Sequence, residues 1–300
     1  MTPNPVLDTL GLPPDGRALL IHTDDIGMCH ASLSAYADLS QRGLISAGSV
    51  MVPCPWFLAT AQHCLTHPDT TDMGVHVTLT SEWDSGYRWG PVSTRDPASG
   101  LMDTDGFMPR TTAEVRANAK PEAVAVEIEA QVTRALEAGI DVTHMDSHMG
   151  GIFDPRFGRA YVEIALEHSI PPYLIRRAST VVGHTDVGDN VAEVDKMLRS
   201  LEARGLPMFD HHTGIRFSDG VSPMAAAKAA FAALQPGLTY LITHPSIDTP
   251  ELRAIITGGW QTRVTEYELL MQPELRDFVE EQGIHIITWR ILRDLMRASL

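Results

Sequence analysis

Short apolar runs alternate with longer amphipathic segments along the chain, and this alternation restricts the possible folds more than any other feature of the sequence. The predicted strands cover residues 18–23, 46–52, 73–79, 142–146, 173–175, 238–243 and 284–288. The predicted helices cover 31–41, 56–64, 122–138, 158–167, 191–203, 225–234, 274–281 and 291–298. Repeated strand–helix units are typical of a parallel β-sheet covered by helices. The sequence therefore predicts an α/β fold, either barrel-like or doubly wound.

One segment, from about residue 81 to 119, interrupts this alternation. It contains Trp83, Tyr87 and Trp89 among several prolines and glycines, and its periodicity is weak. Loops of this length inside a domain are often lids or binding loops, and a disordered surface insertion is the alternative. Since no segment resembles an interdomain linker, we expect a single domain over residues 1–300 with one long insertion.

The charge balance excludes several classes of partner. Lysine and arginine total 23 against 38 aspartates and glutamates, which gives a formal net charge of -15. Proteins that bind nucleic acid or anionic membranes need a basic surface. No apolar run reaches the roughly 18 residues of a membrane-spanning helix, and the first residues lack the features of a signal peptide. We expect a cytoplasmic protein that binds neither nucleic acid nor membrane.

Four predicted strands carry carboxylates or imidazoles, either within the strand or just after its end. These residues are Asp24 and Asp25, His76, His144, Asp146 and His148, and His244. The carboxyl ends of parallel strands meet at one edge of a sheet, so we expect these side chains to converge. Taken singly, His76 is also compatible with an ordinary strand histidine, and His244 with an X-Pro turn.

The spacing of these residues indicates a metal site. On an extended strand His144, Asp146 and His148 share one face, and imidazoles with a carboxylate suit Zn²⁺ or another divalent ion. Histidines that cap helices or lie in a core are the alternative. Asp24 and Asp25 either cap a helix or, if both are buried, need a nearby cation. In the second case one carboxylate binds the metal and the other is free to act as a general base.

The motifs, taken in order, resemble those of the YdjC-like carbohydrate deacetylases. They are residues 24–27 (Asp-Asp-Ile-Gly), 74–80 (Gly-Val-His-Val-Thr-Leu-Thr), 143–148 (Thr-His-Met-Asp-Ser-His), 241–245 (Leu-Ile-Thr-His-Pro) and 287–290 (Ile-Thr-Trp-Arg). With the strand that leads into the first motif they cover residues 18–291, nearly the whole chain. The resemblance implies an irregular, TIM-barrel-like (β/α) barrel related to polysaccharide deacetylases.

The resemblance also implies an activity, the hydrolysis of the N-acetyl group of an amino sugar or short oligosaccharide. By position, it implies one divalent metal ion, Zn²⁺ or Mg²⁺, held by Asp25, His76 and His148. Asp24 matches the general base and His244 the general acid. Two imidazoles favour Zn²⁺ as the tighter ion in vitro.

Other residues are expected near this site. His144 and Asp146 match positions beside the metal ligands, with His144 ranked below His148 as a direct ligand. Arg176 and Arg177 follow a short predicted strand. They are either charge partners for Asp24 or solvated surface arginines.

The chain departs from the family pattern in places that bear on its substrate. His22 stands where asparagine is usual, and residues 149–153 (Met-Gly-Gly-Ile-Phe) replace a stretch that usually holds more histidines. Trp83 and Trp89 suit either stacking on sugar rings or shielding a hydrophobic interface, such as a homodimer contact. The alternatives to a sugar deacetylase are a hydrolase of a non-sugar N-acyl compound and an inactive carbohydrate- or metal-binding protein.

Overall fold

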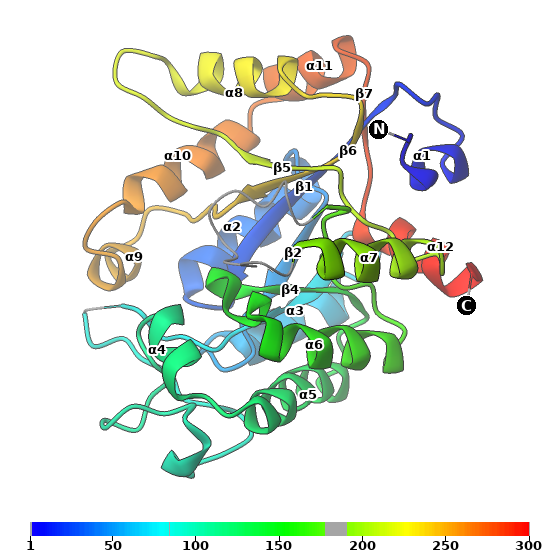
Figure 1. Ribbon diagram of the computed structural model, residues 1–300. Helices are drawn as coiled ribbons and strands as arrows, with labels where there is room; N and C mark the ends of the chain where they lie inside the picture. The colour runs from blue at the N-terminus through cyan, green and yellow to red at the C-terminus, as the bar shows by residue number, and fades with distance from the viewer. Residues whose placement is uncertain (1, 84, 178–190, 300) are drawn as a thin grey trace.

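A parallel β-sheet surrounded by helices forms the centre of the computed structural model, which describes residues 2–83, 85–177 and 191–299 (Figure 1). The strands are β1 (Arg17–Ile26), β2 (Ala47–Val50), β3 (Met73–Val77), β4 (Val142–Ser147), β5 (His211–Gly214), β6 (Gly237–Thr243) and β7 (Ile284–Ile286). Their order is β4-β3-β2-β1-β6-β5, with β7 paired to β1, and each of these pairings is parallel. The predicted α/β fold is confirmed.

A short irregular segment connects the two outer strands of the sheet. Met145 of β4 forms a parallel bridge with Pro172, and Ile175 forms one with Phe209, just before β5. Residues 172–175 therefore occupy the place of a strand, although they make only isolated bridges. The segment therefore lies between the β4 edge of the sheet and the residues that precede β5, and it makes one isolated bridge to each.

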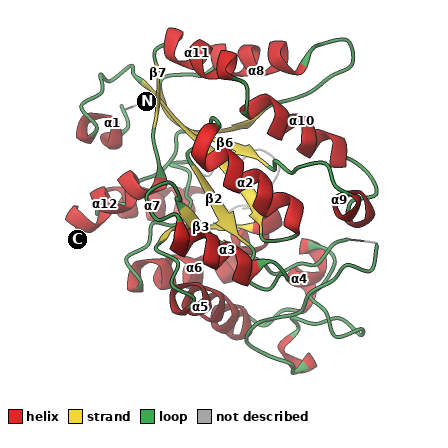
Figure 2. Cartoon of the chain, turned by 180° about the vertical axis from the view of Figure 1, so that it is seen from behind, coloured by secondary structure: helices red, strands yellow, loops and turns green. Residues whose placement is uncertain are grey.

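The helices pack around the strands on several sides. They are α1 (Pro5–Thr9), α2 (His30–Arg42), α3 (Phe57–Thr66), α4 (Thr112–Asn118), α5 (Pro121–Glu137), α6 (Pro155–Glu167), α7 (Val191–Glu202), α8 (Pro223–Ala232), α9 (Pro250–Ile255), α10 (Trp260–Leu270), α11 (Pro273–Glu281) and α12 (Trp289–Ser299), with the 3-10 helices η1 (Pro97–Ser99) and η2 (His148–Phe153). In Figure 1, α8 and α11 lie at the top and α5 and α6 at the bottom, and Figure 2 shows α2 and α3 in front of the sheet. Within the described part of the chain, we find no helix that combines the length and the apolar character needed to cross a membrane.

Helix α5 shows why the sequence forms these elements. Val124, Ile128, Val132 and Ala135 are spaced by three or four residues, and all four are buried. This spacing gives an amphipathic helix one apolar stripe that packs against the core. Pro121 occupies the first turn, where its missing N–H costs no intrahelical hydrogen bond.

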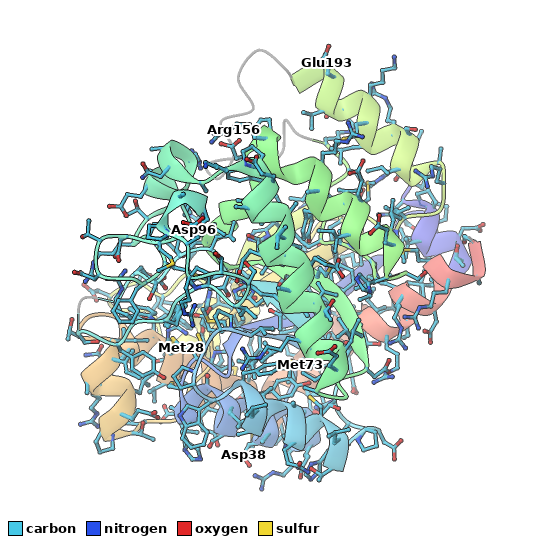
Figure 3. The ribbon with its side chains drawn as sticks, turned by 90° about the horizontal axis from the view of Figure 1, so that it is seen from below. Met28, Asp38, Met73, Asp96, Arg156 and Glu193 are labelled. Atoms are coloured by element: carbon cyan, nitrogen blue, oxygen red, sulfur yellow. The ribbon has the colours of Figure 1, made fainter. Side chains whose placement is uncertain are left out.

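The described part of segment 81–119 is ordered and packed against the rest of the protein. Glu127 of α5 accepts hydrogen bonds from two backbone N–H groups of the segment, at 2.8 and 2.9 Å. Arg156 of α6 donates to a backbone carbonyl of the segment at 2.6 Å, and Figure 3 shows Asp96 and Arg156 on the same side of the molecule. Trp89 is 3% exposed. The interpretation as a disordered insertion is therefore wrong.

Candidate active site

Two adjacent carboxylates lie at the carboxyl end of β1, where its pairing with β2 is irregular. The register shifts at this point, so Asp24 and Asp25 lie in a β-bulge. Asp25 has φ of 61°, in the left-handed region that aspartate tolerates better than most residues. A regular strand would point the two side chains to opposite faces, yet carboxylate oxygens of both lie 3.6 and 3.4 Å from Nε2 of His76. The helix-cap interpretation is wrong, because the N-cap of α2 is Cys29.

Asp25, His76 and His148 bring three possible metal ligands together. Oδ1 of Asp25 lies 3.4 Å from Nε2 of His76 and 3.1 Å from Nδ1 of His148. All three residues are buried, and one ligand atom from each lies within 4.8 Å of the other two. Tetrahedral ligands about 2.1 Å from a zinc ion would lie about 3.4 Å apart. The spacing of this set therefore fits a divalent ion.

Each of the two imidazoles is also held by a further carboxylate. Nδ1 of His76 lies 2.8 Å from Oδ1 of Asp146, and Nε2 of His148 lies 2.8 Å from Oε1 of Glu82. In both cases the other ring nitrogen faces Asp25. Histidines that ligate metals usually donate their second ring N–H to a carboxylate or carbonyl in this way. The donor set thus has the chemistry of a metal site as well as its spacing.

Two other groups of residues bring three possible ligands within the same distance. They consist of His22, His144 and Asp146, and of Asp24, His76 and Asp146. In the first group, the Nε2 atoms of His22 and His144 are only 2.7 Å apart, which is a hydrogen-bond distance. In the second, Nδ1 of His76 is already hydrogen-bonded to Asp146. Asp25, His76 and His148 are therefore the better candidates for metal ligands.

The charges around Asp25 keep its carboxylate ionised. Burial alone would raise the pKa of Asp25, but Arg263, His148 and His76 outweigh this effect and hold the pKa well below its usual range. Arg263 of α10 lies 2.7 Å from Oδ2 of Asp25. Burial has the opposite effect on an imidazole and would lower the pKa of His148, but Glu82 and Asp25 raise this pKa to about 9. A metal ion that binds here must therefore displace a proton from this imidazole.

One carboxylate oxygen of Asp24 is hydrogen-bonded to His22, and the other has no contact as short among the described residues. Oδ1 lies 2.7 Å from Nδ1 of His22, while Oδ2 lies 3.6 Å from Nε2 of His76 and 3.9 Å from Nε2 of His244. The His244 side chain is 36% exposed, against 7% for Asp24, so His244 is the more accessible of the two. The backbone N–H of His244 donates to Glu266 at 2.7 Å. Partial burial lowers the pKa of the His244 imidazole.

The three residues predicted to share one strand face do not all lie on the strand. His144 and Asp146 belong to β4, but His148 begins the turn η2 beyond the strand end. Met149 and Gly150 have φ of 53° and 66°, which ends the extended conformation. The prediction of a common strand face is therefore wrong for His148, and the turn brings its ring to Asp25 instead.

The predicted arginine partners of Asp24 lie elsewhere. Arg176 forms ion pairs with Glu202 and with Asp210, the latter at 2.7 Å. Arg177 is exposed, whereas Asp24 is buried. The interpretation of Arg176 as a charge partner of Asp24 is wrong, because two other carboxylates already bind its guanidinium group.

The two tryptophans of segment 81–119 differ in their surroundings. Nε1 of Trp89 donates to the carbonyl of Thr80 at 2.8 Å, and its ring centroid lies 6.5 Å from that of His148. Trp89 thus packs beneath the site and is too buried to stack on a sugar ring. Trp83 is half-buried, and the Arg263 guanidinium lies 5.7 Å from its ring centroid.

Several residues that contact the site were not predicted from the sequence. Glu82 comes two residues after the motif at 74–80, so the argument from strand ends could have been extended to it. Arg263 and Glu266 lie on α10, far from the motifs, and no local pattern singles them out.

Comparisons with known proteins find relatives that match nearly the whole chain. The YdjC-like protein family matches residues 18–281. A carbohydrate deacetylase from Thermus thermophilus is 30% identical over 295 residues, which cover 97% of this chain and 99% of that protein. A carbohydrate deacetylase from Thermoanaerobacter pseudethanolicus is 23% identical over 277 residues, which cover 92% of this chain and 100% of that protein.

The fold also has a counterpart among solved structures. A crystal structure of an Enterococcus faecalis protein proposed to cleave cellobiose phosphate superposes with a TM-score of 0.73 at 19% identity. The superposition covers 92% of this chain and 99% of that one. At this level of identity the similarity shows a shared fold.

Proposed function

The chain belongs to the YdjC-like protein family, and from this premise we propose that it is a metal-dependent hydrolase that removes the acetyl group from an N-acetylated amino sugar or short oligosaccharide. One observation carries the proposal: two buried imidazoles, each held by its own carboxylate, face the ionised Asp25. The carbohydrate deacetylases among its relatives support the sugar as substrate. The pairing of the strands in the described residues into one sheet supports a single domain over residues 1–300.

Asp25, His76 and His148 would hold the ion. Two imidazoles with one carboxylate favour Zn²⁺ over Mg²⁺ as the more tightly bound ion. When bound, a divalent ion would polarise the acetyl carbonyl and lower the pKa of the attacking water. Asp146 and Glu82 fix the orientation of the two imidazoles through their second ring nitrogens.

Asp24 would act as the general base. Its Oδ1 is hydrogen-bonded to His22, so Oδ2, on the side of His76 and His244, is the oxygen available for a proton. As the oxygen of water attacks the carbonyl carbon, Asp24 would accept a proton from that water at Oδ2.

His244 would act as the general acid. The C–N bond breaks as the amine leaves, and the amine nitrogen needs a proton to become a good leaving group. A lowered pKa makes the imidazolium form of His244 a stronger acid, so it gives up its proton readily once it has taken one. The partial exposure of this ring supports the proposal, because it leaves the imidazole accessible to a substrate.

Two alternative functions predict different products. A hydrolase of non-sugar N-acyl compounds uses the same polar groups without a sugar subsite, whereas an inactive binding protein has no need of a base and an acid. Asp24 and His244, both close to the candidate ligands, favour an enzyme.

A substrate panel tests the proposal. With Zn²⁺-loaded protein we expect acetate and free amine in equal amounts from N-acetylglucosamine or chitobiose, and much less from N-acetylated amino acids. Acetate and amine are quantified separately. Release only from the amino acids would shift the assignment to non-sugar amides. Calorimetric binding of the sugars without any release would indicate an inactive binding protein.

A further inference from the structure

A continuous line of hydrogen bonds runs from Asp24 into the interior of the strand arrangement. Oδ1 of Asp24 lies 2.7 Å from Nδ1 of His22, whose Nε2 lies 2.7 Å from Nε2 of His144. Nδ1 of His144 lies 3.0 Å from the hydroxyl of Thr143, and this hydroxyl is hydrogen-bonded to the carboxyl group of Asp72. All five residues are buried. The mechanism above uses only the first bond of this chain.

The contact between the two imidazoles restricts where the protons lie. Two nitrogen atoms 2.7 Å apart need a proton between them, because otherwise their lone pairs repel. A neutral imidazole has one N–H. If His144 donates from Nε2, its Nδ1 must accept from Thr143, and the Thr143 oxygen can then accept from a protonated Asp72. If His22 donates instead, every bond reverses and the protonated carboxyl group is Asp24.

A third arrangement keeps both carboxyl groups ionised and places a positive charge on one imidazole. Burial lowers the pKa of His144 well below its usual value and raises the pKa of Asp72. Both shifts favour neutral groups at the inner end of the chain. Of the two neutral arrangements, only the one with protonated Asp72 leaves Asp24 free to accept a proton.

The surroundings prevent the rings from turning away. His144 stacks on Trp289 with centroids 4.6 Å apart and planes at 8°, and His22 stacks on Tyr240 at 4.9 Å. A Cβ atom on Gly74 would lie 2.5 Å from the His144 ring, so only glycine leaves room for the imidazole there. The ring positions are thus fixed by packing, and the protons decide which bonds form.

The other end of the chain is also anchored. Oδ2 of Asp72 accepts a hydrogen bond from the backbone N–H of Arg290 at 2.7 Å, which leaves Oδ1 for Thr143. The hydroxyl of Tyr36 lies within hydrogen-bond distance of the backbone carbonyl and N–H of Asp72, at 3.0 and 3.1 Å. Oδ2 of Asp72 is therefore occupied by a backbone donor, and Oδ1 faces Thr143, to which it donates only when the carboxyl group is protonated.

We propose that Asp72 and Thr143 are positioning residues for Asp24, and that they act by fixing the direction of the hydrogen bonds through His144 and His22. In this arrangement every donor in the chain points toward Asp24. The carboxylate then receives a hydrogen bond at Oδ1 and keeps Oδ2 free for the reaction. The inference rests on the proposed function, because it takes Asp24 to be the base.

Substitution of Thr143 separates the hydroxyl from the shape of its side chain. Thr143→Val removes the hydroxyl and keeps the shape, whereas Thr143→Ser keeps the hydroxyl. We expect Thr143→Val to lower kcat about tenfold or more, with KM within about twofold, since His144 loses its partner at Nδ1 and the direction of the hydrogen bond between His22 and the Asp24 carboxylate is no longer fixed. Thr143→Ser should recover most of the activity.

Substitution of Asp72 tests the direction of the hydrogen bonds between Asp72 and Asp24. In Asp72→Asn the amide oxygen can accept from Arg290 and the amide nitrogen can donate to Thr143, as a protonated carboxyl group does. We expect this variant to keep most of the kcat, and Asp72→Ala to lose as much as Thr143→Val. A loss in Asp72→Asn equal to that in Asp72→Ala would overturn the proposal, because it would mean that Asp72 accepts from Thr143.

A measurement without substrate separates this inference from the proposed function. ¹⁵N NMR of histidine-labelled, full-length protein loaded with Zn²⁺, which is diamagnetic, reports the tautomer of each ring. We expect a neutral His144 protonated at Nε2 and a neutral His22 protonated at Nδ1 in the wild type and in Thr143→Ser, with this pattern lost in Thr143→Val. A His144 protonated at Nδ1 in the wild type would overturn the inference. The expected tautomers in a protein that releases no acetate would overturn the proposed function alone.

Discussion

Replacing Asp24 with asparagine is expected to lower kcat by about 10²–10⁴-fold, the range that a general base contributes. The amide nearly matches the carboxylate in size, and its oxygen can still accept the hydrogen bond from His22. It cannot take a proton from water at the position of Oδ2. Acetate release under saturating substrate measures the loss, and a competition titration with a chelating dye measures metal affinity, which should stay within about threefold of the wild type.

The matched control for this substitution is Asp69→Asn, at an exposed carboxylate. It should leave both kcat and metal affinity unchanged. If Asp24→Asn retains a kcat within tenfold of the wild type, then Asp24 is not the base. A large loss of metal affinity in Asp24→Asn would instead place this carboxylate among the ligands.

Replacing His148 with alanine is expected to weaken metal binding by more than about 100-fold. Changes to groups that merely orient a ligand already cost 10–100-fold in affinity, and this change removes a ligand atom itself. It also leaves Glu82 without the imidazole that now lies 2.8 Å from its carboxylate. The dye competition measures the affinity, and elemental analysis after gel filtration measures the retained metal.

His144→Ala is the control for His148→Ala, because both remove a buried imidazole. We expect it to retain metal affinity within about tenfold, even though it breaks the chain of hydrogen bonds to Asp24. The opposite result, with affinity lost in His144→Ala and kept in His148→Ala, would move the metal to the group formed by His22, His144 and Asp146.

The general position of the site could be predicted because it depends on local patterns. Apolar runs mark strands, and the residues that end parallel strands must meet at one edge of the sheet. Asp24, Asp25, His76 and His244 converge in this way. The alternation of strands and helices also predicts the fold class. Among the strands of the described residues, β5 alone was missed, since its residues, His-His-Thr-Gly, contain no apolar run.

The detailed geometry of the site depends on departures from regular secondary structure. The pattern of apolar and polar residues does not predict these departures. A strand repeat of two residues would separate Asp24 from Asp25, and only the bulge brings their carboxylates to the same imidazole. His148 reaches Asp25 through a turn with two positive φ angles rather than along β4. The two-residue repeat of a strand cannot predict the side-chain positions of residues whose backbone departs from that repeat.

Ion pairs between residues far apart in the chain are the second feature of the site that could not be predicted from the sequence. Arg176 follows a short predicted strand and was expected either to pair with Asp24 or to lie at the surface, but Glu202 and Asp210 bind it. The arginine that contacts the site is Arg263, 238 positions from Asp25 in the chain. Pairings of this kind follow from how helix α10 packs, which no local motif specifies.

Acetate release by chelator-stripped protein, before and after each divalent ion is restored, tests metal-dependent deacetylation most directly. The substrate is chitobiose, and Asp24→Asn is measured beside the wild type. We predict that the stripped wild type releases almost no acetate, that Zn²⁺ restores release, and that Asp24→Asn stays inactive although it binds the ion. Undiminished release by stripped protein that elemental analysis shows to be free of metal would contradict the account.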